Sequence, residues 1–146
     1  MSQKIVCQNK KARFDYFIDE TLEAGLVLLG PEVKSLREGR ANLVDSYARV
    51  RGGEVFIHNM HINPYPYAHH VVLDPLRVRK LLLRKKEIKR LIGKTENKGY
   101  TLIPTKVYFS RKGHAKVEIA LAKGKQKHDK RQALKEKDLR REMRNY

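Results

Sequence analysis

The sequence contains no tryptophan, a single cysteine, Cys7, and no run of roughly 18 apolar residues that could span a bilayer as a helix. One cysteine cannot form an internal disulfide, which is typical of proteins in a reducing compartment. The apolar stretch near the start, Ile5-Val6-Cys7, is too short for the core of a signal peptide. These absences predict a cytoplasmic protein with no membrane-spanning segment.

Acidic residues are also scarce. The 146 residues include 33 Lys and Arg against 16 Asp and Glu, which gives a formal net charge of +17. A field of that strength attracts polyanions and repels other basic chains. Nucleic acid is therefore the first candidate partner, and an anionic membrane surface is the second.

The chain divides by composition into a mixed body, residues 1–122, and a basic tail, residues 123–146. The body is long enough for one compact domain, which we expect to bind RNA. The tail has few apolar side chains, so it cannot bury enough surface to offset its ordering entropy. We expect the tail to be disordered alone and helical on a partner, because its residues are good helix formers.

Six segments of the body have the composition of short strands, and turn residues separate them. Gly52-Gly53 predicts a two-residue hairpin, and Pro104 favours an edge position or a bulge in its strand. Six short strands with a few helices predict a small closed barrel. Among such barrels we expect the oligonucleotide-binding (OB) type, by analogy with other basic proteins of this fold class. The expected strands are Phe14–Ile18, Leu22–Leu29, Ser46–Arg51, Glu54–Met60, Tyr100–Phe109 and Lys116–Leu121.

Two further segments have helical patterns. Pro31–Glu38 starts with a proline and is followed by Gly39, both favourable positions at helix ends. A second helix is expected from Pro75 to Ile92, with Asp74 before it and Gly93 after it. The spacing of its apolar residues also allows two short helices with a break near residues 84–86.

Two basic clusters are candidate phosphate contacts. The first comprises Lys10, Lys11 and Arg13 beside Asn9, with aromatic residues following, so it could hold phosphates and stack bases. The same pattern also fits an ordinary first strand with core aromatics. The second cluster holds eight basic residues, for which we favour phosphate contact over a solvated helix face. These are Arg77, Arg79, Lys80, Arg84, Lys85, Lys86, Lys89 and Arg90.

Signals for catalysis are weak. Six histidines lack carboxylate or cysteine partners at ligand spacing, and Gly93-Lys94-Thr95 lacks the earlier glycine of a phosphate loop. The acidic residues between Asp15 and Glu23 fit a solvent-facing strand better than a nuclease metal site. The sequence predicts no enzyme, no metal and no cofactor.

Several stretches taken together resemble one family, small protein B, the tmRNA-binding (SsrA-binding) protein. Their order and spacing from residue 9 to about residue 131 argue against chance similarity. They are Asn9–Arg13, Leu22–Leu26, Glu32–Arg37 with Gly39, Asp45–Tyr47, Asn63–Tyr65, Asp74–Leu83, Glu87-Ile88, Gly99–Leu102, Ala115–Val117, Ala122–Lys125 and Asp129–Arg131.

This resemblance implies a six-stranded OB-type barrel with three short helices and a role in trans-translation. Such a protein binds the tRNA-like part of tmRNA and enters the vacant decoding site of a stalled ribosome, against small-subunit RNA. The nascent chain is then tagged for degradation and the ribosome is rescued. Elongation factor Tu and alanyl-tRNA synthetase are expected to act on the same tmRNA, and the free protein is expected to be a monomer.

By position, the resemblance places RNA-binding residues at Asn9, Glu23, Leu82 and Lys116. The carboxylate of Glu23 could accept hydrogen bonds from base amino groups or ribose hydroxyls, or be a plain solvent-facing residue. Leu82 could be interface or core. Lys116 should be exposed, because it lies on the strand face opposite Val117. The neighbouring cations Lys10, Lys11, Arg13, Lys123 and Lys125 complete the expected RNA surface.

The tail residues implied to contact the ribosome are Gly124, His128, Asp129, Lys130 and Arg131. Gly124 is expected to let the chain turn away from the body. The last turn departs from the family pattern, because Glu142-Met143 stands where two apolar residues are expected. Three rival readings remain: a general ribosomal RNA-binding protein, an enzyme acting on RNA, and a basic protein of membrane surfaces.

Overall fold

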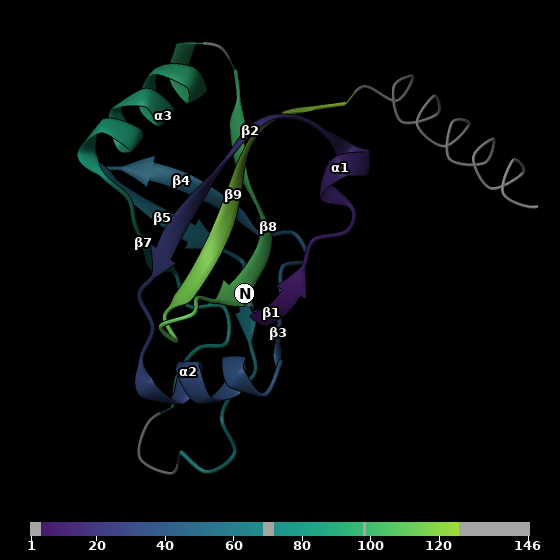
Figure 1. The fold of residues 1–146 in the computed structure, drawn as a ribbon, viewed down its shortest axis with the longest axis vertical. Helices are drawn as coiled ribbons and strands as arrows, with labels where there is room; N and C mark the ends of the chain where they lie inside the picture. The colour runs from purple at the N-terminus through teal and green to yellow at the C-terminus, as the bar shows by residue number, and fades with distance from the viewer. Residues whose placement is uncertain (1–3, 69–71, 98, 126–146) are drawn as a thin grey trace, which may run out of the picture.

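Most of the regular structure is β. The computed structural model describes residues 4–68, 72–97 and 99–125. Within these ranges, six antiparallel strands pair in the order β8-β4-β5-β7-β2-β9, and β9 pairs with β8 to close a ring (Figure 1). The six strands are β2 (Tyr16–Leu26), β4 (Tyr47–Arg51), β5 (Glu54–His58), β7 (Arg79–Leu82), β8 (Thr101–Phe109) and β9 (Ala115–Gly124).

The remaining elements lie around this ring. Helix α2 lies at one end of the ring and α3 at the other (Figure 1). Each helix contributes a fully buried leucine, Leu36 or Leu91, to the same core. The bounds are β1 (Lys4–Gln8), α1 (Ala12–Asp15), α2 (Gly30–Arg37), β3 (Ala41–Asn42), β6 (His61–Ile62) and α3 (Lys85–Asn97). Strand β1 extends the sheet beside β8, and β3 pairs with β6.

Strand alternation decides which side chains fill the ring. In β9, Val117, Ile119 and Leu121 are at most 1% exposed, as the alternating pattern predicts. In β5, Val55 and Ile57 are fully buried in the same cluster. The residues between these core positions face outward, and they include the half-buried Glu118 and Phe56. The outer face is covered in part, because Ala120 and Ala122 of β9 are also fully buried.

The local turn signals are confirmed. Gly52 and Gly53 have φ angles of 60° and 76° and join β4 to β5, the conformation that a two-residue hairpin requires. Pro104 lies at a register shift between β8 and β9, so the proposed bulge is confirmed. The helix expected over Pro31–Glu38 is confirmed as α2.

Two expectations about single elements are wrong. The segments Phe14–Ile18 and Leu22–Leu29 are not separate strands, because β2 runs unbroken from Tyr16 to Leu26 and Phe14 belongs to α1. A shift in register after Ile18 lets the long strand bend without breaking.

The second error concerns Pro75–Ile92, where a helix was expected. Its first part forms β7, and α3 begins only at Lys85 and continues through Gly93. Arg79 and Leu81 are each 1% exposed, and Leu82 is exposed, so burial alternates as in a strand. Because a buried arginine occupies an inward position, the sequence lacks the alternation of apolar and polar residues that would predict a strand.

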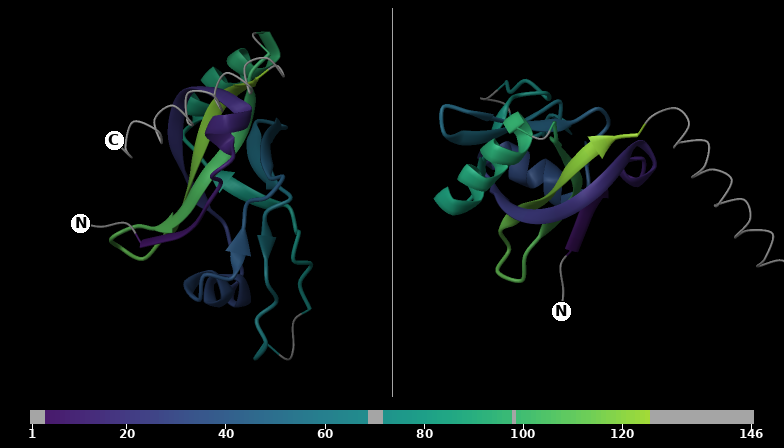
Figure 2. Two further views of the ribbon diagram at one scale, coloured as in Figure 1. Left: turned by 90° about the vertical axis from the view of Figure 1, so that its right-hand side faces the viewer. Right: turned by 90° about the horizontal axis from the view of Figure 1, so that it is seen from above.

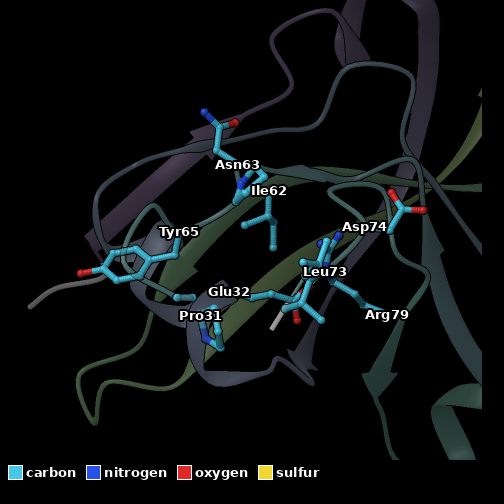
Figure 3. A pocket seen from close by; sticks show the side chains of 11 residues that line it. Pro31, Glu32, Ile62, Asn63, Tyr65, Leu73, Asp74 and Arg79 are labelled. Atoms are coloured by element: carbon cyan, nitrogen blue, oxygen red, sulfur yellow. Dashed lines mark hydrogen bonds and ion pairs between the residues drawn. The ribbon is translucent and has the colours of Figure 1, made fainter. Parts of the chain in front are cut away.

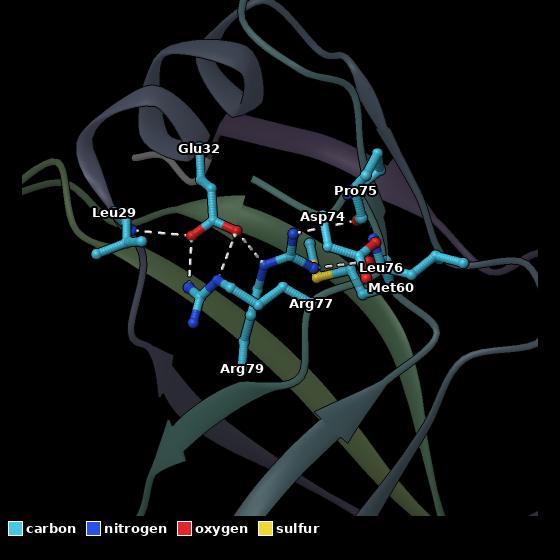
Figure 4. A network of polar contacts seen from close by, with 8 residues as sticks. All are labelled: Leu29, Glu32, Met60, Asp74, Pro75, Leu76, Arg77 and Arg79. Carbon is cyan, nitrogen blue, oxygen red and sulfur yellow. Dashed lines mark hydrogen bonds and ion pairs between the residues drawn. The ribbon is translucent and has the colours of Figure 1, made fainter. Parts of the chain in front are cut away.

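Arg79 is tolerated inside because Glu32 of α2 neutralises it (Figure 4). The Arg79 Nε donates to Glu32 Oε2 over 2.6 Å, and Arg77 Nη2 donates to Glu32 Oε1 over 2.6 Å. Arg79 also donates to the Met60 carbonyl over 2.6 Å, and the Leu29 amide donates to Glu32 over 2.9 Å. Burial raises the pKa of Glu32, but the hydrogen bonds from Arg77, Leu29 and Arg79 outweigh it, so the pKa lies below its ordinary value.

Candidate nucleic-acid interface

One row of residues crosses the outer surface of four strands. Antiparallel pairing places Leu82 of β7 beside Gly25 of β2, Gly25 beside Lys116 of β9, and Lys116 beside Tyr108 of β8. Their strand neighbours, such as Val117, point into the core. The row therefore brings together two of the residues that the family resemblance implicated, Leu82 and Lys116.

Leu82 belongs to the surface and not to the core. The residue is 55% exposed, and a Cβ added at Gly25 would lie only 3.3 Å from the Leu82 Cβ. The glycine thus lets the leucine lie close against the backbone of β2. Leu82 and the half-buried Lys116 line a shallow groove of about 340 Å³, which also includes His114.

Glu23 lies beside this row and is held by a tyrosine. It is exposed, and its Oε2 accepts a hydrogen bond from the hydroxyl of Tyr108. Burial raises the pKa of Tyr108, and the hydrogen bond to Glu23 raises it further, so the hydroxyl stays a donor at neutral pH. Glu23 is therefore an oriented carboxylate. Sequence reasoning missed Tyr108, because only the strand register reveals that it contacts Glu23.

A second carboxylate faces Glu23 directly across the strands, which would be unfavourable if both were free. Glu118 of β9 is the register partner of Glu23. It has its own partners, however: Thr105 Oγ1 donates over 2.8 Å, and Lys106 Nζ lies 3.6 Å away. Because Glu118 is neutralised within the sheet, Glu23 can offer its charge to a ligand.

The first basic cluster lies at the end of β1, beside the bulge of β8. The backbone N–H of Asn9 donates to the Thr105 carbonyl over 2.7 Å, and the side-chain Nδ2 of Asn9 donates to the Pro104 carbonyl over 3.4 Å. These bonds hold Asn9, Lys10 and Lys11 along a second groove of about 340 Å³.

The cations of this cluster remain available. Lys10, Lys11 and Arg13 are exposed, and none of them forms an ion pair within the described ranges. The aromatic Tyr16 packs against Ala12 in a small cluster under α1. The cations thus face solvent while part of the aromatic surface serves packing.

The end of β9 adds two more cations against aromatic rings. Lys123 Nζ lies 4.7 Å from the centre of the Tyr100 ring, and Lys125 Nζ lies 5.0 Å from that of Phe17. Gly124 does not start a turn as expected. It pairs with Tyr16 as the last residue of β9, and it is not among the glycines with positive φ. His128, Asp129, Lys130 and Arg131 lie outside the described residues.

The second basic cluster does not form one face. Arg77 and Arg79 are bound to Glu32, and Arg79 is too deeply buried to reach a phosphate. Lys80 pairs with Glu54 over 3.0 Å, and Arg90 lies 3.4 Å from Glu20. The remaining cations are exposed at the start of α3: Arg84, Lys85, Lys86 and Lys89.

A third cavity, of about 190 Å³, lies between α2 and the segment that precedes β7 (Figure 3). Its polar lining comprises Asn63, Asp74 and the pair Glu32 and Arg79, which bind each other, and Tyr65 also lines it. The Glu32 carboxylate accepts hydrogen bonds from the Leu29 amide, Arg77 and Arg79, so this ion pair has a structural role. Among the described residues, no group of three metal-ligating side chains comes together.

The comparisons with known proteins all point to one protein family. The family model described as SmpB protein matches residues 6–146. This chain belongs to the SmpB family. The resemblance to small protein B drawn from the sequence is thereby confirmed.

Individual relatives cover almost the whole chain. The SsrA-binding protein of Geobacillus thermodenitrificans is 59% identical over 140 residues, covering 96% of this chain and 90% of that protein. That of Geobacter sulfurreducens is 56% identical over 143 residues, covering 98% and 93%. A solved chain described as "tmRNA-SmpB: a journey to the center of the bacterial ribosome" is 48% identical, with a TM-score of 0.69 and coverage of 87% and 92%. In the part of this chain that was searched, no helix is long and apolar enough to cross a membrane.

Proposed function

We propose that this protein binds tmRNA and acts with it on stalled ribosomes in trans-translation. The observation that carries the proposal is the 48% identity, over 87% of the chain, to a solved SmpB chain described together with tmRNA and the ribosome. The net charge of +17 supports a polyanionic partner. The protein acts as a binding protein and not as an enzyme, in the cytoplasm where ribosomes translate.

The tRNA-like part of tmRNA is the RNA that the outer surface of β7, β2, β9, β8 and β1 would hold. Lys116 supplies a charge for a phosphate, Leu82 an apolar contact for a base or ribose, and Glu23 an acceptor for amino or hydroxyl groups. Asn9 and the cations beside it extend this surface toward α1. A fixed acceptor between cations adds specificity, since charge alone does not distinguish one RNA from another.

The ring of six strands would be an OB-type barrel, with body residues 1–122 binding RNA and residues 123–146 acting as a separate tail. The tail would contact small-subunit RNA at the decoding site through Gly124, His128, Asp129, Lys130 and Arg131. Elongation factor Tu and alanyl-tRNA synthetase would act on the same tmRNA, and the free protein would be a monomer.

The test is recovery of the bound RNA. Tagged full-length protein is incubated with bacterial extract, and the captured RNA is sequenced. Strong enrichment of tmRNA over transfer RNA and ribosomal RNA fragments is expected. Recovery of ribosomal RNA with no enrichment of tmRNA would contradict the proposal and favour a general ribosomal RNA-binding protein.

A further inference from the structure

The bulge of β8 lies between the two parts of the candidate RNA surface. The pairing of β8 with β9 resumes at Lys106 and Glu118 after a shift in register, which leaves Thr105 as the extra residue of the bulge. The Thr105 carbonyl accepts the backbone N–H of Asn9 over 2.7 Å. In the left view of Figure 2, β1 runs beside the hairpin of β8 and β9 and leads into α1. The bulge therefore fixes the end of β1, where the groove beside Asn9 begins.

The side chain of Thr105 connects the bulge to the other part of the surface. Its Oγ1 donates to Glu118 Oε1 over 2.8 Å, and Glu118 Oε2 lies 3.6 Å from Lys106 Nζ. That ammonium group lies 5.5 Å from the centre of the Tyr108 ring. The hydroxyl of Tyr108 in turn donates to Glu23. A continuous series of contacts therefore runs from the end of β1 to Glu23.

These contacts are partly shielded from water. The side chains of Lys106 and Glu118 are 28% and 25% exposed, and Tyr108 is 2% exposed. Hydrogen bonds to a charged group are stronger than neutral ones, and a lower local dielectric strengthens them further. Because the Glu118 carboxylate binds two partners, its removal would free both Thr105 and Lys106.

Glu118 is an acid within a surface that we expect to bind a polyanion. By its charge alone it disfavours RNA, because a carboxylate repels phosphates. It also faces Glu23 directly across the strands, where like charges are unfavourable. A favourable role of Glu118 in RNA binding must therefore act through the groups that it holds, and not through contact with phosphate.

We propose that Glu118 is a positioning residue for the tRNA-like RNA. Through Thr105 it fixes the bulge beside Asn9. Through Lys106 it holds the ring of Tyr108 and hence the carboxylate that this ring orients. A folded RNA needs contacts at fixed separations, and a surface ordered in advance binds it with less loss of entropy. An unstructured RNA adapts to the surface and gains little. The inference rests on the proposed function, because it takes the tRNA-like RNA as the ligand.

The experiment uses the sign of the effect. Full-length Glu118→Ala is compared with wild type in gel shifts at one salt concentration, with the tRNA-like part of tmRNA and with an unstructured RNA of the same length. Loss of a negative charge alone would tighten both complexes. Positioning predicts that Glu118→Ala weakens binding of the tRNA-like RNA about fivefold and does not weaken that of the unstructured RNA. Glu118→Gln, whose amide oxygen still accepts from Thr105, should restore most of the affinity.

Glu54→Ala is the matched control for charge. Glu54 of β5 pairs with Lys80 over 3.0 Å, and β7 and β2 separate β5 from β9 in the ring. This variant removes the same charge and should bind the tRNA-like RNA at least as tightly as wild type. A second variant, Thr105→Val, changes no charge and should weaken binding of the tRNA-like RNA about threefold. Undiminished binding of that RNA by Glu118→Ala would overturn the proposal, and so would equal weakening of both RNAs.

A measurement without RNA separates this proposal from the proposed function. In NMR spectra of the free, ¹⁵N-labelled protein, Glu118→Ala should shift the backbone amide signal of Asn9, and Glu54→Ala should leave it in place. An Asn9 signal that Glu118→Ala leaves unshifted would overturn the positioning role. Wild-type protein that does not prefer the tRNA-like RNA over the unstructured RNA contradicts the proposed function instead, and the Asn9 signal still decides whether Glu118 holds the bulge.

Discussion

Replacing Glu32 with alanine should be among the most destabilising single changes in the body. The side chains of Glu32 and Arg79 are 4% and 1% exposed, and their charged atoms lie 2.6 Å apart. Without the carboxylate, Arg79 keeps only its bonds to the carbonyls of Met60 and Pro75, at 2.6 and 3.2 Å. Removal of one partner of a buried pair costs about 3–5 kcal/mol, against a total of about 5–15 kcal/mol for a typical domain.

The measurement is urea unfolding followed by circular dichroism, since the protein has no tryptophan. Glu32→Ala should lower the free energy of unfolding by about 3–5 kcal/mol. Glu38→Ala is the matched control, because Glu38 lies 3.1 Å from Arg40 in a pair whose side chains are 42% and 48% exposed. That change should cost less than about 1 kcal/mol. Similar small losses for both variants would refute the reasoning.

The same carboxylate predicts a pH dependence. The pKa of Glu32 is lower in the folded protein than in the unfolded chain, so the unfolded state binds more protons between the two values. Its contribution to stability is complete above the unfolded pKa, about 4.3, and is lost as pH falls through the folded pKa. Wild-type stability should thus decline more steeply below about pH 5 than that of Glu32→Ala. Parallel slopes would contradict this.

Three further outcomes concern RNA. Glu23→Ala should weaken binding of the tRNA-like RNA at least about tenfold in a gel shift. Tyr108→Phe, which keeps the Glu23 carboxylate but removes the hydrogen bond that orients it, should weaken binding less. Equal effects of the two variants, or no effect of either, would contradict the role of Glu23 as an oriented acceptor. For about six phosphate contacts, a plot of log K against log salt should have a slope near −5, and a flat line would contradict counterion release. A chain ending at Gly124 should keep most of its affinity for tmRNA yet fail to support tagging on ribosomes stalled at a truncated message; normal tagging would refute the role of the tail.

Local signals in the sequence predicted the local structure well. Gly52-Gly53 indicates its hairpin because the turn itself requires positive φ, and Pro31 and Gly39 mark the ends of α2 for similar reasons. The strand β7 was missed because its inward position holds Arg79. The partner that makes such burial possible, Glu32, lies 47 residues earlier in the chain, and no window of sequence contains both.

The site was predictable only in part, for a related reason. Family resemblance pointed to Glu23, Leu82 and Lys116, but sequence alone left open whether Leu82 is core or surface. Strand register resolves this by placing Leu82 over Gly25 on the outside. Register also supplies Tyr108, which contacts Glu23 from 85 residues away. Contacts across strands depend on pairing that no local pattern specifies.

The most direct test of the account compares two lysines of one hairpin. Lys116 lies in the row beside Leu82, whereas Lys112 is exposed in the turn between β8 and β9. The affinity of full-length protein for the tRNA-like part of tmRNA is measured by gel shift for Lys116→Ala and Lys112→Ala. Lys116→Ala should bind about tenfold more weakly or worse, since hydrogen bonds to charged groups contribute about 1.5–3 kcal/mol. Lys112→Ala should bind nearly as wild type; equal losses for the two variants would contradict the assignment of the RNA to this face.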